Sequence, residues 1–585
     1  MKKQLTIIAL AVTMIFSLLL GLAALPVQAE VEKLDWTGYD ELIGQIKSAT
    51  DFVEREALMH QAEDILMDSG AIVPLYYYND VYMAKPDLTG YYSNLYGFKY
   101  FMLSENGESD SIRLCLASEP DKLDPALNSS VDGACLAVNS FSGLFAYNDE
   151  GQVVPELVDT FEVSEDGLVY TFTLKDDLKW SDGEALTAKD FEYSWKRAVN
   201  WMTAADYAYM FDCIEGYPVI EDPEAEITEE MANEAADGLN VVASEDGKTL
   251  TVTLKAPTPY FLDLCAFPTY YPVNQATVEG AKGFRDEDGN IKDPGAWANE
   301  AGFVSNGAYI LTKWEHNSSM TYEKNPNYHR ADEVKIEKLE FMLSDDHAVI
   351  FSAYNSGDLD FIDAVPTDEI KGLIESENPE FHIVDNLGTY FVIFNVKSPL
   401  FDGKTVEEAK NLRKAISLLI DRQFIVDTVA QTGQKLANTF IPAGMADGHG
   451  GVFKENDEDY TYPVEDEVGY FSLEPDVEAA MELLQAAGFE FEGEMLSANT
   501  PLKIRYLLNK SEAHEKVAES IQQDLAVLGI EMEIEVMDWA TVLNERKAGN
   551  YDVARHGWIA DFNDPINMLE MWSTDSGNND AQFGR

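Results

Sequence analysis

Hydrophobic and polar positions follow different rhythms in the two halves of the chain. From Ile112 to about Thr389, short apolar runs alternate with turns, and 170–174 and 250–254 have the period of half-buried strands. After Thr389, the helices expected are 406–420, 477–488 and 512–528, and the strands between them are 390–395, 502–508 and 532–536. Strands that alternate with helices predict an α/β domain with parallel strands.

The segment before Ile112 has its own order of elements. Residues 40–69 predict two helices, with Thr50 or Asp51 as the N-cap of the second and Gly70 at its end. Strands are expected at 71–78 and 82–85, the latter stopped by Pro86. The polar, glycine-containing stretch 104–110 predicts a flexible joint.

The first residues have the pattern of an export signal. Lys2 and Lys3 precede an apolar run from about 7 to 25, and Val27-Gln28-Ala29 has the small-x-small form of a cleavage site. We therefore expect a signal peptide at 1–29, with an uncleaved membrane anchor as the alternative. No cysteine lies near the run, so an N-terminal lipid anchor is not expected.

Charge and cysteine content narrow the function classes. The 585 residues include 105 acidic and 41 basic side chains, a formal net charge of −64, which argues against binding to nucleic acid or anionic lipid. The spacing of Cys115, Cys135, Cys213 and Cys265 fits no zinc motif. One disulfide and buried free thiols are both open.

Catalytic motifs are missing from the sequence. It contains no Walker loop, no G-x-S-x-G, no H-E-x-x-H and no C-x-x-C, so we expect neither an enzyme nor a cofactor. The acidic runs 286–288 and 457–459 lack the ligand spacing of a calcium loop, so no metal site is expected.

The stretch 551–565 combines both charges with an aromatic side chain. Arg555, Trp558, Asp561 and Asp564 lie on one predicted strand and the turn after it. A zwitterionic peptide needs a carboxylate for its amino end and a cationic group for its carboxyl end. The alternative interpretation is an internal ion pair between Arg555 and a nearby aspartate.

Several motifs along the chain resemble a known family. They are Leu123-Asp124-Pro125, the run 155–183 that ends in Trp180-Ser181-Asp182-Gly183, Asn306-Gly307-Ala308-Tyr309, Asn325-Pro326-Asn327-Tyr328, 356–360 and 412–422. In this combination the chain resembles the periplasmic oligopeptide-binding proteins of the family-5 solute-binding proteins. The resemblance implies an α/β, two-lobed, type II periplasmic-binding-protein-like fold with an extra sub-domain and the ligand between the lobes. It also implies an exported monomer, in the periplasm or on the outer face of the cytoplasmic membrane, that delivers oligopeptides to the permease subunits of an ABC importer.

The order of the segments differs from that of the family. Family members begin with the strand found here at Ile112 and end with the piece found here at about 40–101, so the chain resembles a circular permutant. We expect 30–104 to be the family's C-terminal segment and 105–111 to join the old termini. Lobe 1 is expected at 112–387, with a sub-domain at about 143–265, and lobe 2 at 388–585. The segment 30–104 adds helices to lobe 2 and strands to lobe 1.

The resemblance also suggests roles for individual residues. Asp561 resembles the anchor of the peptide α-amino group. The basic set expected at the peptide carboxyl end is Arg555, Arg546 and His514, and the pocket and backbone-contact positions expected are Trp558, Trp539, Tyr207 and Val131. Ala430 replaces a lysine of some members, and Ile559 with Gly388 replaces a disulfide.

Other functions stay open at this point. The ligand could be a dipeptide or a nickel complex, although Asp561 favours a peptide amine. The protein could be a peptide sensor without its own transporter, or a rearranged, non-functional product.

Overall fold

The computed structural model describes residues 34–585 except 118, 221–226 and 457–459. The expected signal peptide therefore lies outside the described residues. Within the described part, every helix is too short or too polar to cross a bilayer.

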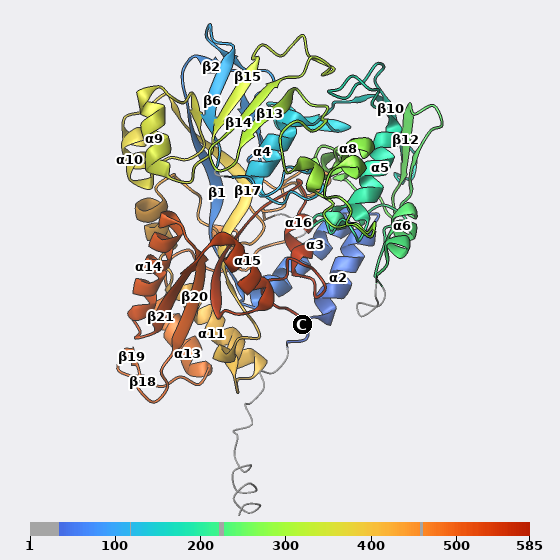
Figure 1. The fold of residues 1–585 in the computed structure, drawn as a ribbon. Coiled ribbons are helices and arrows are strands. Elements are labelled where there is room, and N and C mark those ends of the chain that lie inside the picture. The colour runs from blue at the N-terminus through green and yellow to red at the C-terminus, as the bar shows by residue number, and fades with distance from the viewer. Residues whose placement is uncertain (1–33, 118, 221–226, 457–459) are drawn as a thin grey trace, which may run out of the picture.

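A ten-stranded mixed sheet runs through both lobes (Figure 1). Its order is β13 (Tyr309–Glu315), β14 (Ser319–Lys324), β15 (Lys338–Met342), β6 (Ser111–Cys115), β16 (Phe361–Ile362), β1 (Ile72–Ala84), β17 (Phe381–Phe394), β22 (Val553–Ile559), β20 (Lys503–Asn509) and β21 (Glu531–Met537). In the division expected from the sequence, the strands from β13 to β16 belong to lobe 1, and β22, β20 and β21 belong to lobe 2. The long strands β1 and β17 lie between the two sets and connect them.

Strand β1 is continuous where the sequence predicts two strands. It pairs with β17 from Ile72 opposite Ile393 to Met83 opposite Phe381, with register shifts between Pro74 and Tyr76 and between Tyr77 and Asn79. The sequence predicts separate strands at 71–78 and 82–85. The partner strand keeps the ladder intact there, because a bulge absorbs the irregularity without ending the pairing.

Lobe 2 has the alternating architecture that the sequence predicts. Strand β20 is parallel to β21 and to β22. The helices are α11 (Val406–Leu419), α13 (Val477–Ala486), α14 (Glu512–Ala526) and α15 (Trp539–Ala548). The predictions for the first three are confirmed to within two residues, because each has a regular apolar face.

A smaller four-stranded sheet forms the outer part of lobe 1. Its strands are β11 (Val241–Ala243), β12 (Thr249–Thr253), β10 (Val169–Leu174) and β9 (Val158–Val163), in that order, and α5 (Ala188–Val199) packs on it. Strands β10 and β12 are antiparallel partners. Both were expected from their alternating pattern.

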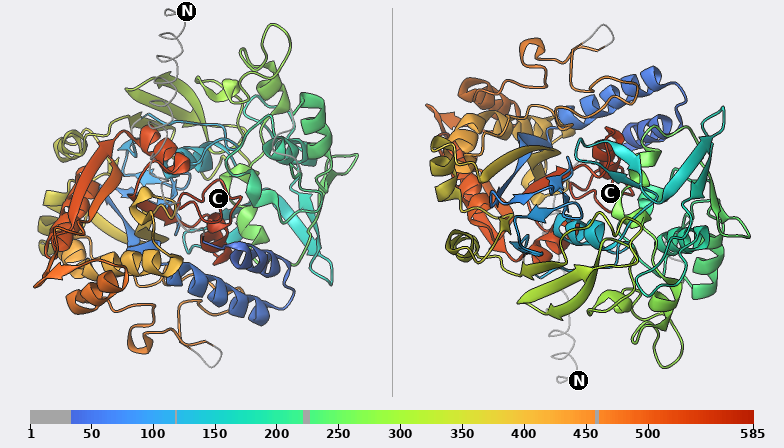
Figure 2. Two further views of the ribbon diagram at one scale, coloured as in Figure 1. Left: turned by 90° about the horizontal axis from the view of Figure 1, so that it is seen from below. Right: turned by 90° about the horizontal axis from the view of Figure 1, so that it is seen from above.

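The two N-terminal helices lie beside the C-terminal residues (Figure 2). They are α2 (Thr37–Ser48) and α3 (Phe52–Asp68). The ring of Trp36 stacks on Phe583 with centroids 4.0 Å apart, and the Tyr39 hydroxyl donates to the Leu569 carbonyl at 2.8 Å. Asp51 caps α3 by accepting two backbone N–H groups.

The stretch expected to be a flexible joint is instead held by hydrogen bonds. Strand β5 (Glu105–Asn106) pairs with β2 (Leu88–Thr89), and the Gly107 N–H donates to the Asp87 carbonyl at 3.0 Å. The four cysteines, which all lie in the described part, are free thiols.

Candidate functional site

Strand β22 and the loop after it carry the charged residues that the sequence singles out. Arg555 and Trp558 lie on β22, where they pair with Val392 and Thr389 of β17. Asp561 follows in the loop 560–565. The strand lies between β17 and β20, so its side chains emerge at the junction of the two lobes.

Asp561 is a buried carboxylate held only by neutral groups. It is 6% exposed, accepts from the Tyr207 hydroxyl at 3.1 Å and accepts from the Asn567 amide at 3.2 Å. Among the described residues, no lysine, arginine or histidine forms an ion pair with it. The hydrogen bonds fix its orientation and leave its charge without a counter-ion.

The absence of a counter-ion changes the acidity of this carboxyl. The pKa of Asp561 is raised to about 7, mainly by burial and to a smaller extent by the nearby Glu570 carboxylate, while hydrogen bonds from Asn567, Tyr207 and Tyr209 lower it. A group with this pKa gains much from a cationic ligand, because the ligand supplies the missing charge.

Asn567 is a positioning residue that the sequence analysis missed. Its side-chain oxygen accepts from the indole Nε1–H of Trp558 at 3.0 Å and from the Asp561 backbone N–H at 3.1 Å. Its amide donates to the Asp561 carboxylate. One amide thereby holds Trp558 and Asp561 together, in the turn that opens α16 (Ile566–Leu569).

Arg555 is a half-buried cation without an acidic partner. Its Nη2 donates to the Tyr78 hydroxyl at 3.1 Å, and its guanidinium lies 5.1 Å from the ring centroid of Tyr390 and 5.9 Å from that of Trp539. No aspartate or glutamate of the described chain forms an ion pair with it. The internal ion pair considered from the sequence is therefore wrong.

Arg546 and His514, the other members of the expected basic set, differ in their charge and in their partners. Arg546 is 3% exposed, and its Nε lies 3.1 Å from the Asp580 carboxylate. His514 lies on α14, with Nδ1 3.3 Å from the Tyr390 hydroxyl. Burial, together with the charge of Arg555, holds the pKa of His514 well below its usual range, so its imidazole is neutral.

The aromatic ring of Trp539 lies close to the guanidinium groups of both Arg546 and Arg555. It begins α15 and is 48% exposed, with the Arg546 guanidinium 5.6 Å from its ring centroid. Val131 begins α4 (Val131–Ser140), and its side chain is exposed. Ser129, two positions before it, donates to Asp206, which precedes Tyr207. In the part of the chain that the structure describes, Val131 itself forms no hydrogen bond or ion pair with Asp561 or Arg555.

The lobes touch each other around Asp561. Tyr207, from lobe 1, reaches across to the carboxylate, and Tyr260 stacks on Phe562 with centroids 4.4 Å apart. Lys47 lies 2.6 Å from both Asp212 and Glu570. Asp561 therefore lies where the two lobes are in contact.

Sequence comparisons place these features in a family. The family model for bacterial extracellular solute-binding proteins, family 5 (middle), matches residues 152–580. The oligopeptide-binding protein OppA of Bacillus subtilis is 32% identical over 494 residues, which cover 81% of each protein. The dipeptide-binding protein DppE of the same organism is 30% identical over 463 residues, 79% of this chain and 76% of DppE.

Solved structures agree with this result. Haemophilus influenzae OppA in complex with the peptide RPPGFSPFR gives a TM-score of 0.65 at 28% identity, over 81% of this chain and 85% of OppA. One structure of the Escherichia coli murein tripeptide-binding protein MppA also gives 0.65 at 28% identity, over 81% and 84% of the two chains. The unliganded open form of MppA gives 0.53 at 28% identity, over 82% and 84%.

The lower score of the open form fits the contacts between the lobes around Asp561. From the match of the family model and the shared two-lobed fold, the chain belongs to the family-5 bacterial extracellular solute-binding proteins.

Proposed function

We propose that this protein is an extracytoplasmic receptor that binds oligopeptides between its lobes and delivers them to an ABC importer. The observation that carries the proposal is a pair of uncompensated, opposite charges at the lobe junction. Asp561 lacks a cationic partner, and Arg555, on the strand that leads to it, lacks an anionic one. The ends of a peptide supply both missing charges.

Strand β22 also suits the backbone of a peptide. Arg555 and Asp561 are six positions apart, so a ligand that reaches both is extended along the strand direction. The relatives include proteins named for oligopeptide, dipeptide and murein peptide binding. A nickel complex is less suitable, because the neutral hydrogen-bond donors around Asp561 leave no set of metal ligands at the anchor.

The direct test is a thermal melt with and without a library of short peptides. At about 100 times its Kd, a peptide should stabilise the protein by about 2.7 kcal/mol. Asp561→Asn should weaken the affinity by about 30-fold or more, since a buried charge pair is lost. Asp159→Asn, at an exposed position of β9, is the matched control and should bind like the wild type.

Two results would contradict the proposal. One is a cooperative transition that no peptide raises; a nickel-complex titration then tests the alternative ligand. The other is Asp561→Asn protein that binds peptide as tightly as the wild type.

Export and a monomeric state belong to the same proposal. The pattern at 1–29 supports cleavage after Ala29, which an intact mass of the mature protein beginning at Glu30 would check. A peptide sensor without its own transporter is the alternative, and uptake of labelled peptide by cells with and without the protein separates the two.

We also propose that the segment order is circularly permuted. The alignments to relatives cover about four fifths of both partners, and the N-terminal helices pack on residues near the C-terminus. In that arrangement, 105–111 joins segments that are termini in the relatives. A rearranged, non-functional product is the competing interpretation, and it should fail to unfold in one cooperative transition.

A further inference from the structure

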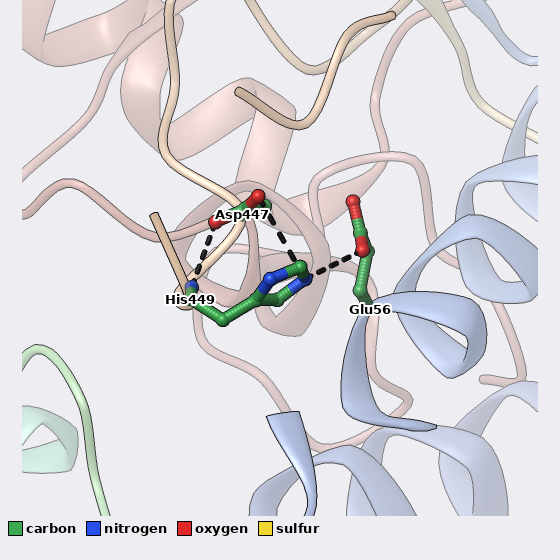
Figure 3. Close-up of side chains that lie close together, drawn as sticks. All are labelled: Glu56, Asp447 and His449. Carbon is green, nitrogen blue, oxygen red and sulfur yellow. Dashed lines mark hydrogen bonds and ion pairs between the residues drawn. The ribbon is translucent and has the colours of Figure 1, made fainter. Parts of the chain in front are cut away.

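A second cluster of ionisable side chains lies apart from the peptide site. Glu56 lies on α3, and Asp447 and His449 lie in the loop 445–453 (Figure 3). The atoms that each side chain could offer to a metal lie within 4.8 Å of one another. His449 Nε2 lies 2.8 Å from a Glu56 oxygen and 3.7 Å from Asp447 Oδ2.

The loop holds the Asp447 carboxylate in place. Its oxygens accept the backbone N–H groups of His449, Gly450 and Gly451 at 2.7, 2.9 and 2.8 Å. Burial alone would raise the pKa of Asp447, but these hydrogen bonds outweigh it and lower the pKa below its usual value. The carboxylate is therefore ionised and oriented before any ligand arrives.

Glu56 is positioned from the helix side. It is largely buried, and its second oxygen lies 3.9 Å from His60, whose ring stacks between Phe453 and Tyr460. Neighbours of this kind orient metal ligands in many sites. The cluster thus joins a rigid helix to a hydrogen-bonded loop.

The donor set favours a particular class of ion. Zinc bonds of about 2.0–2.1 Å in tetrahedral geometry separate neighbouring ligand atoms by about 3.3 Å. The 3.7 Å between His449 Nε2 and Asp447 Oδ2 is close to that value. The 2.8 Å between His449 Nε2 and the Glu56 oxygen is a hydrogen-bond distance, which would open by about 0.5 Å when a metal replaces the bond. An imidazole nitrogen among carboxylate oxygens favours zinc-like ions, whereas calcium and magnesium prefer oxygen alone.

We propose that Glu56, Asp447 and His449 form a binding site for a divalent transition metal such as Zn²⁺, with water as the fourth ligand. The sequence gives no sign of this site, because Glu56 is nearly 400 positions away from the loop. A metal binds only the unprotonated Nε2 of His449, so we expect the affinity to fall at acid pH.

The site lies next to the contact between the lobes. Gly448, between two of the ligands, approaches the Arg55 guanidinium, the Asp564 carboxylate and Pro259 of lobe 1; a Cβ there would lie 3.5–3.7 Å from them. Arg55 precedes Glu56 on α3 and forms a two-bond ion pair with Asp564. A bound metal would tie α3 to the loop behind the segment that carries Asp561.

Calorimetric titration of the peptide-free protein with Zn²⁺ tests the proposal. We expect one site per chain, with His449→Ala and Glu56→Gln each weakening it at least tenfold. His316→Ala is the matched control, because the His316 ring also has two carboxylate neighbours. Glu119 lies 2.5 Å from Nδ1 and Glu300 lies 3.5 Å from Nε2, on opposite sides of the ring. The two carboxylates and one ring nitrogen therefore cannot bind the same ion.

Co²⁺ substitution gives a second readout. Visible absorption bands of tetrahedral intensity should appear in the wild type and be lost in Glu56→Gln, a variant that keeps the size of the side chain. The proposal is overturned if His449→Ala and Glu56→Gln leave zinc binding unchanged, or if His316→Ala weakens it as much. The first result would mean that the strongly acidic surface binds zinc without a defined site.

Discussion

At the scale of single residues, the proposed peptide site depends on charges that the protein leaves uncompensated. Asp561 is held by an amide and a hydroxyl, and Arg555 by a tyrosine hydroxyl and aromatic rings. Neutral partners of this kind fix a side chain without satisfying its charge. Each charge can therefore still form an ion pair with a ligand group of opposite charge.

The raised pKa of Asp561 predicts how peptide affinity depends on pH. In the unliganded protein this carboxyl has a pKa of about 7, which is higher than the pKa of an aspartate in the unfolded chain. The protonated form therefore stabilises the folded protein fully at pH values below the unfolded-state pKa, and this stabilisation is lost as the pH rises through 7. A peptide ammonium binds the ionised form. Below pH 7 the affinity should therefore fall by about tenfold per pH unit, until the pKa of the complex is reached.

Calorimetric titration with peptide from about pH 5 to about pH 8 measures this slope, because the range covers both sides of the pKa. Asp561→Asn should bind weakly with little pH dependence. An equally steep slope in that variant would assign the titration to another group, such as Glu570, whose pKa burial also raises to about 7.

At the scale of elements, buried ion pairs connect the N-terminal helices to lobe 2. Arg55 of α3 donates to both oxygens of Asp564 at 2.7 and 2.8 Å, and the side chains are only 3% and 1% exposed. Asp564 in turn accepts the N–H of Ile566 at the start of α16. The pair therefore fixes the loop that presents Asp561.

Replacing only one partner of this ion pair should lower the free energy of unfolding. Arg55→Met leaves the Asp564 carboxylate buried without a counter-ion, so we expect a loss of about 3–5 kcal/mol in the free energy of unfolding. The double variant Arg55→Met/Asp564→Asn removes both charges and should recover much of that loss. Urea unfolding measures both values. If the double variant is as unstable as the single one, packing of the arginine rather than its charge is the main contribution.

At the scale of the whole molecule, the strands β1 and β17 lie in the middle of the ten-stranded sheet, and we propose that the N-terminal helices belong to lobe 2. The contacts of Trp36 with Phe583 and of Tyr39 with Leu569 bring the N-terminal helices to the C-terminal residues. In the proposed permutation, the hydrogen-bonded turn at 105–111 joins the two segments.

Restoring the order of the relatives tests the permutation. A chain cut at the exposed Gly107–Glu108 bond, with Arg585 linked to Leu34 by a short flexible joint, should fold in one cooperative transition and bind peptide with unchanged affinity. Its stability should change by no more than about 1–2 kcal/mol, since only loop closure differs. A broad transition in the reordered chain would contradict the proposal, and one in the natural chain would favour a non-functional product.

The sequence by itself determined the elements whose signals are local. The apolar faces of α11, α13 and α14 and the alternation in β10 and β12 appear in a few consecutive turns or residues, so their bounds were predictable. Arg555, Trp558 and Asp561 could be proposed as site residues for the same reason, because one strand and its turn carry all three. The family motifs added the two-lobed fold.

Only the tertiary structure decided how distant segments meet. It joined the two predicted strands at 71–85 into β1, since β17 offers a continuous partner. It surrounded Arg555 with Tyr78 and Tyr390 instead of an aspartate, and it brought Glu56 to His449. Periodicity specifies which face of an element is buried, but the contacts between elements are set by packing of the whole chain.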